Sequence, residues 1–142
     1  MINAIFHAHS GLRFLVLLAA VVALLVQALG VFGRQPYGRP SRISMAVFSG
    51  LLDLQVTLGI VMVVLGCFYG ALMGHLLMMV LAIGALHGCK AYARRQADGR
   101  RAHTVALVGV VLALALMVGG ISAIGRTPVT RSGAPTCAAA HR

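Results

Sequence analysis

Long apolar runs separated by short polar connectors dominate the chain. Each run is close to the roughly 20 residues that a helix needs to cross about 30 Å of hydrocarbon at about 1.5 Å per residue. The stretch from Ser44 to Cys89 is too long for one such helix, and the glycines of "GCFYG" (66–70) favour a turn within it. The pattern therefore predicts an all-α integral membrane four-helix bundle. The expected spans are about residues 11–32, 44–66, 70–89 and 104–124.

The composition favours a membrane protein over a water-soluble domain. Of the 142 residues, 60% are hydrophobic and 10% are charged, whereas soluble domains average about 25% charged residues. The spans occupy residues 1–124, and the small residues and prolines of 125–142 predict an extended periplasmic tail. The start, "MINAIFHAHSG", lacks the basic region and cleavage site of a secretory signal, so we expect it to be retained.

The basic residues predict an orientation. The net charge is +10, and such a charge can indicate nucleic-acid binding when it gathers on one surface. Here most of the basic residues lie in the connectors after the first and third apolar runs, and the positive-inside rule places those connectors in the cytoplasm. Both termini then face the periplasm of a bacterial inner membrane, and nucleic acid is not an expected partner. The connector residues are Arg34, Arg39, Arg42, Lys90, Arg94, Arg95, Arg100 and Arg101, and the others are Arg13, Arg126, Arg131 and Arg142.

Two residues of opposite charge, Arg13 and Asp53, fall at membrane depth, where ionisable groups are costly and often functional. One interpretation is structural: the two residues pair, or Arg13 reaches lipid phosphates while a protonated Asp53 is hydrogen-bonded. The other interpretation makes Asp53, with Gln55 nearby, a proton-carrying group beside a quinone or a transported substrate. Arg13 would then hold an anionic group such as a propionate.

Histidines near the outer ends of the first and third spans are candidate haem ligands. His7 and His9 point about 200° apart on a helix, so at most one of them enters a shared pocket. Arg13 lies one turn beyond His9 on the same face, which favours His9. His9 and His75, from two helices at similar depth, suit the two axial positions of a b-type haem. Interfacial hydrogen bonding is the alternative role for both.

A second pair of histidines lies toward the cytoplasmic side. His87 follows His75 on the same helix at a distance of about 18 Å, so these two side chains do not ligate one iron. A second haem at His87 would need His103, the only other histidine at that level.

The three cysteines form no CxxC pair, and "CAAAHR" is not the CxxCH sequence that attaches c-type haem. Cys67 and Cys137 both fall on the expected periplasmic side, where a disulfide can form. A flexible tail need not approach the turn, so free thiols are favoured over a bridge. Cys89 falls on the reducing side.

Four segments of the chain resemble a family of small bacterial four-helix membrane proteins labelled cytochrome b-like. The similarity runs over most of residues 5–124, and it implies haem binding. The segments are "HAHSGLRF" (7–14), "LLDLQVTLG" (51–59), "GHLLMM" (74–79) and "ALHGCKAYA" (85–93).

The resemblance can be followed residue by residue. The histidines that the family carries at both ends of its third helix are matched by His75 and His87. Its second helix typically has a histidine two residues before a glutamine, but here Asp53 takes that place, which removes one candidate ligand. The family's first motif is matched by His9, Ser10, Gly11, Arg13 and Phe14.

Three functions follow from these observations. The first is electron transfer through haem b ligated by His9 and His75, with Arg13 and His87 as further cofactor contacts and a quinol or a larger complex as partner. The second is a non-catalytic accessory subunit of a respiratory or photosynthetic complex, or a homo-oligomer, holding bound lipid or quinone. The third, a small transporter built around Asp53, is less favoured because paired broken helices are not apparent. An electron carrier or accessory subunit is expected rather than a stand-alone enzyme.

Overall fold

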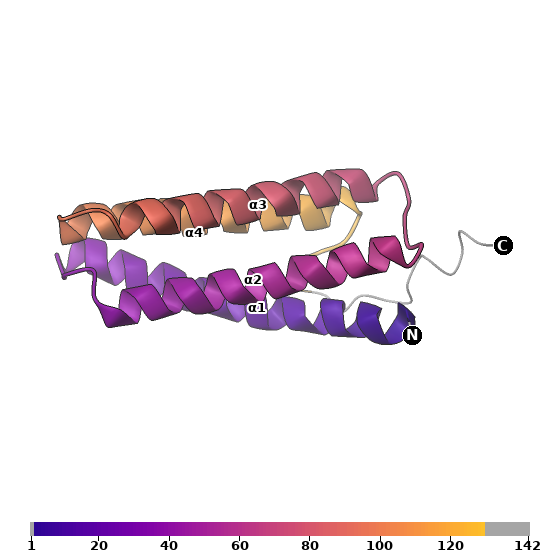
Figure 1. The fold of residues 1–142 in the computed structure, drawn as a ribbon, viewed down its shortest axis with the longest axis horizontal. Coiled ribbons are helices and arrows are strands. Elements are labelled where there is room, and N and C mark those ends of the chain that lie inside the picture. The colour runs from indigo at the N-terminus through magenta and orange to yellow at the C-terminus, as the bar shows by residue number, and fades with distance from the viewer. Residues whose placement is uncertain (1, 130–142) are drawn as a thin grey trace.

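The computed structural model describes residues 2–129, which form four helices and no strand. Successive helices run in opposite directions (Figure 1). Because the described residues form helices and no strand, the bundle is all-α as predicted. All four helices are long and apolar enough to cross a membrane. Most of the expected tail, residues 130–142, lies outside the described part. The helices are α1 (Ile2–Phe32), α2 (Arg39–Val64), α3 (Leu72–Ala93) and α4 (Gly99–Ala123).

The helices extend beyond most of the predicted runs, because apolar runs indicate the hydrocarbon layer and not where backbone hydrogen bonding stops. α1 begins at Ile2 instead of near residue 11, and α3 continues to Ala93. The turn between α2 and α3 lies close to the predicted place, over residues 65–71. Gly66 adopts a φ of 90° there, which glycine reaches without strain.

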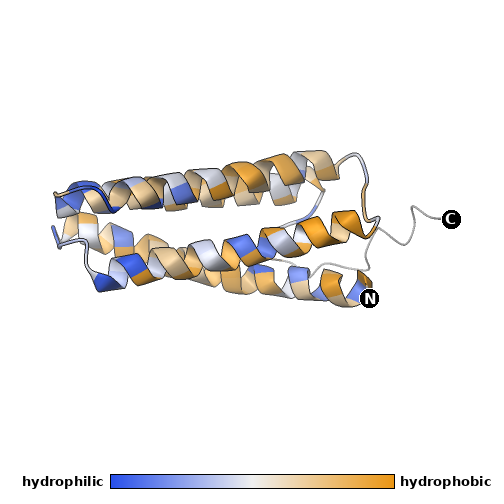
Figure 2. Ribbon diagram, in the orientation of Figure 1, coloured by the Kyte–Doolittle hydropathy of each residue, from blue (hydrophilic) through white to orange (hydrophobic). Residues whose placement is uncertain are grey.

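The two other connectors are short and lie together at one end of the bundle. α2 begins after Gly38 with a proline in its first turn, and α4 begins after Asp98, whose side chain accepts a hydrogen bond from the backbone N–H of Arg100. Hydrophilic residues gather at this connector end, whereas the helices are largely hydrophobic along their length (Figure 2). The basic connectors therefore share one end, and α1 begins and α4 ends at the other end (Figure 1).

The helices pack most closely as α3 with α4 and α1 with α2, and the seam between α2 and α3 has the fewest contacts of the neighbouring pairs. Alanines let the backbones approach, as is usual where helices associate in lipid. Large apolar side chains are exposed on all four helices, as expected for surfaces that face hydrocarbon. Fully buried core residues include Ala20, Ala23, Met45, Phe48, Leu52, Ala82, Leu86, Ala106 and Ala113.

One expectation for the cysteines is corrected. Cys67 is almost completely buried and is disulfide-bonded, so it is not the free thiol that the sequence favoured. Cys89 has a free thiol and packs against Gly109, where its side chain fills the space that a Cβ would take. Cys137 lies outside the described residues.

Candidate functional site

A cavity lies inside the bundle at the end where α1 begins and α4 ends. The space between its lining atoms is about 1030 Å³, its open mouth included. We call this cavity the slot, and its wall is mostly apolar. The apolar lining includes Val16, Leu52, Val56, Leu76, Met79, Met117 and Ile121, and the polar lining comprises His9, Ser10, Arg13, Gln55, Tyr69, His75 and Arg126.

His9 reaches this slot from α1 and is fixed by a two-way contact with α2. Its Nδ1 lies 3.0 Å from the backbone carbonyl of Gln55, and the Gln55 side-chain amide donates to the carbonyl of His9 at 2.9 Å. A carbonyl only accepts, so Nδ1 is the protonated ring nitrogen. Nε2 then keeps its lone pair, and it has no hydrogen-bond partner among residues 2–129.

His75 reaches the slot from α3 and is fixed in the same way by α4. Its Nδ1 lies 2.9 Å from the carbonyl of Gly120. Gly120 belongs to the last turn of α4, where carbonyls lack a donor further along the helix. His75 therefore also exposes an Nε2 lone pair, which is not hydrogen-bonded within the described part of the chain. The sequence predicted that His9 and His75 lie at similar depth, and the structure places both in one cavity.

A glycine opposite each imidazole permits this arrangement. A Cβ at Gly59 would lie 3.3 Å from Cε1 of His9, and a Cβ at Gly120 would lie 3.4 Å from Nδ1 of His75 and 2.8 Å from the Met79 methyl group. The distance to the His9 ring is tighter than an ordinary contact, and the distance to the His75 ring is at the short limit of ordinary contact. Each ring therefore lies directly against helix backbone, which fixes the direction of its free nitrogen.

Two arginines add positive charge to the slot. Arg13 is buried at 7% exposure, with its guanidinium carbon 4.9 Å from the centroid of the Phe14 ring. Arg126 lies over the ring of Phe6 at 5.4 Å. It returns to the cavity because its N–H bonds to the carbonyl of Ile121, after the chain has reversed at Gly125 with a φ of 68°. Arg126 was expected in the tail and not in the cavity, although a glycine just after the apolar run is a signal for such a reversal.

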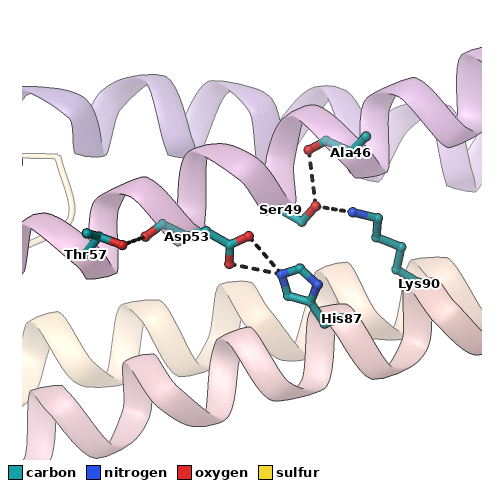
Figure 3. A network of polar contacts seen from close by, with 6 residues as sticks. All are labelled: Ala46, Ser49, Asp53, Thr57, His87 and Lys90. Carbon is teal, nitrogen blue, oxygen red and sulfur yellow. Dashed lines mark hydrogen bonds and ion pairs between the residues drawn. The ribbon is translucent and has the colours of Figure 1, made fainter.

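Asp53 lies outside the slot and pairs with His87, which corrects the expected pairing with Arg13. Nε2 of His87 is 3.0 Å from both carboxylate oxygens of Asp53, and each side chain is 43% exposed (Figure 3). On α2, Leu52 and Gln55 face the cavity. A step of about 100° per residue turns Asp53 away from it, toward α3.

Further polar contacts follow the same α2–α3 seam (Figure 3). Lys90 donates to the hydroxyl of Ser49 at 2.5 Å, and that hydroxyl donates to the carbonyl of Ala46 at 3.1 Å. Thr57 donates to the carbonyl of Asp53 at 2.8 Å. His87 is thus held in a polar strip between α2 and α3, away from the cavity that His9 and His75 share.

His103 belongs to a buried cluster at the connector end. Its Nδ1 lies 2.8 Å from the side-chain oxygen of Gln27, and Gln27 donates at 3.2 Å both to the carbonyl of Ser41 and to the hydroxyl of Ser44. The ring of Tyr37 meets the His103 ring edge-on at 5.1 Å. The cluster joins α1, α2 and α4. Gln27 was not among the predicted site residues, although a glutamine inside an apolar run is a signal for a buried polar contact.

The donor set of the slot suits a particular class of group. Among residues 2–129, no three His, Cys, Asp or Glu side chains come together to hold a bare metal ion. Two imidazole nitrogens in one cavity, from His9 and His75, can instead complete the coordination of a metal that brings its own planar ligands. His7 does not contribute, because its side chain is exposed.

Comparison with protein-family models, with curated proteins and with solved structures finds no match to this chain.

Proposed function

We propose that the chain is a membrane-bound b-type cytochrome that transfers electrons through one haem, ligated by His9 and His75. The observation that carries this proposal is the matched hydrogen bonding of two imidazoles that line one cavity. Each ring donates from Nδ1 to a backbone carbonyl and leaves Nε2 without a hydrogen-bond partner in the described part of the chain. Histidines that ligate metals usually have such a partner on the second nitrogen, because it fixes both the tautomer and the ring direction.

The rest of the slot fits a haem as well. Its mostly apolar wall suits the apolar faces of a macrocycle. Arg13 and Arg126 are placed to bind the anionic propionates through charge-assisted hydrogen bonds. Gln55 contributes a buried side-chain oxygen that has no partner in the described part of the chain. When bound, the haem supplies one-electron redox chemistry.

The chain's own residues perform three tasks in this proposal. Gln55 and Gly120 hold the two rings through backbone carbonyls, which raises the basicity of the ligating nitrogens. Positive charge from Arg13 and Arg126 favours the reduced, more negative state of a bound redox group. The apolar wall keeps the site dry.

The proposed location follows from the basic connectors. Arginine-rich connectors remain on the cytoplasmic side of a bacterial inner membrane, so the cavity end, with both ends of the chain, faces the periplasm. The haem would then exchange electrons with a partner on the outer side of the membrane or within the outer leaflet.

The test is an absorption spectrum of the full-length protein, isolated in mild detergent from membranes supplied with haem. The expected result is a Soret band and, on reduction with dithionite, sharp alpha and beta bands of a six-coordinate b-type haem. His9→Ala and His75→Ala should each abolish or convert these bands. Exogenous imidazole should restore the six-coordinate spectrum of His75→Gly.

His7→Ala and His87→Ala are the matched controls, because each removes an imidazole from the same helices outside the slot. Both should keep the wild-type spectrum. Circular dichroism confirms that the variants remain helical. Haem-free wild-type protein would contradict the proposal and favour an accessory subunit, and equal loss of haem from all four alanine variants would contradict the ligand assignment.

A further inference from the structure

The connector end carries a basic surface cavity between the first connector and the end of α3. Arg39, Arg42 and Arg94 line it, together with Tyr37. All three arginines are exposed, and within residues 2–129 none has a carboxylate at ion-pair distance. The buried hydroxyl of Tyr37 also lacks a hydrogen-bond partner among these residues. The cavity therefore offers several donors and uncompensated positive charge to an anion.

The chain has little acid with which to neutralise this charge. It contains two acidic residues in all. One, Asp53, is paired with His87, and the other, Asp98, caps the start of α4. No carboxylate among residues 2–129 is therefore left to neutralise the basic cavity.

A second feature adjoins the basic cavity. An apolar groove runs along the outer face of α1 and α2, between residues 15–26 of α1 and residues 39–51 of α2. From Pro40 to Leu51 a helix rises about 16 Å at about 1.5 Å per residue. This is close to half of the roughly 30 Å hydrocarbon layer, which is the depth of one leaflet.

The groove and the cavity meet at two residues. Arg39 and Ile43 line both. The basic cavity at the connector end is therefore continuous with an apolar groove that is about as long as one leaflet is deep. A free phosphate would use the arginines only, whereas a phospholipid matches the charge, the groove and the depth together.

We propose that Arg39, Arg42 and Arg94 bind the phosphate of an anionic phospholipid, one acyl chain of which lies in the groove between α1 and α2. Guanidinium groups bind phosphate through paired hydrogen bonds, and basic pockets beside membrane helices on the cytoplasmic side bind such headgroups. The site lies at the opposite end of the bundle from the His9–His75 slot, so it does not depend on haem binding.

The test is native mass spectrometry of the full-length protein in mild detergent, titrated with phosphatidylglycerol, with phosphatidylcholine of the same acyl chains and with glycerol phosphate. The site variant is Arg39→Gln/Arg42→Gln/Arg94→Gln. Its matched control, Arg95→Gln/Arg100→Gln/Arg101→Gln, removes the same charge from the same end of the bundle. A third variant, Val47→Trp, fills the groove at an exposed position and leaves the arginines in place.

Wild-type protein should bind phosphatidylglycerol in preference to phosphatidylcholine. The site variant should bind it about 100-fold more weakly, at about a fivefold loss for each of the three arginines, and the control should bind as wild type does. Val47→Trp should also weaken phosphatidylglycerol binding. Equal loss in the two triple variants, equal binding of the two lipids, or glycerol phosphate binding as tightly as the intact lipid would each overturn the proposal. Helix content by circular dichroism checks folding, and Val47→Trp tests the groove even if the site variant does not fold.

Discussion

Gly30 is the position where the smallest substitution should disturb the bundle most. A Cβ at Gly30 would lie 2.2 Å from the ring of His103. The ring is 1% exposed, bonded to Gln27 on one side and stacked edge-on against Tyr37, so it has no direction in which to retreat. Gly30→Ala therefore forces α1 and α4 apart or breaks the contact between His103 and Gln27.

The size of the effect follows from three terms. Overpacking a filled interior costs about 1–3 kcal/mol, and losing a buried hydrogen bond costs about 1 kcal/mol. The better helix propensity of alanine returns up to about 1 kcal/mol. The free energy of unfolding should therefore fall by about 1–3 kcal/mol. The assay is reversible unfolding in mixed micelles at rising SDS fraction, followed by circular dichroism.

Gly84→Ala is the control, because nothing lies within 4 Å of the position that its Cβ would take. This variant should be unchanged or slightly more stable. Gly30→Ala/His103→Ala should recover part of the loss, since the new methyl group then meets an empty space. If Gly30→Ala is as stable as wild type, the packing of His103 against α1 is wrong.

Three further predictions concern single side chains. Asp98→Ala removes the cap on the N–H of Arg100 and should lower the free energy of unfolding by about 1 kcal/mol in the same SDS titration; no change would contradict the cap. Asp53→Asn breaks the ion pair with His87 outside the slot, so it should keep the haem bands and cost about 0.6 kcal/mol, a typical value for polar contacts between membrane helices; loss of haem would refute its placement. Burial raises the pKa of Tyr37 above its ordinary value, against the opposing effect of nearby arginines. This residue therefore contributes stability that is present below pH 10 and is lost as pH rises through the raised pKa. Tyr37→Phe should reduce the loss of unfolding free energy at alkaline pH, measured in unfolding curves.

The fold could be predicted because hydrophobic length is a local property. Apolar runs of sufficient length predicted four helices, and the structure has four. Helix ends were less accurate, since the mixed apolar and polar residues before position 11 interrupt the apolar run but continue α1. His9, for example, lies within α1 and contacts Gln55 of α2.

The partners of polar side chains were harder to predict, because they depend on how each helix is rotated about its axis. Asp53 and Arg13 are opposite charges in the apolar runs, and a pair between them was one of the interpretations that the sequence left open. A rotation of about 100° per residue separates Asp53 from the slot-facing Leu52, and the α2–α3 seam supplies His87. By contrast, the depth of His9 and His75 follows from their positions along α1 and α3, so the sequence could predict that both lie at the same level of the bundle.

The Asp53–His87 pair has a consequence for how the protein is made. A carboxylate near the centre of a single inserting helix costs about 2.5–3.5 kcal/mol, and α2 carries one before its partner has been synthesised. His87 arrives only with the third helix, after the short turn at residues 65–71. The second and third helices are therefore expected to leave the insertion machinery as a hairpin, with the acid and the imidazole entering the bilayer together.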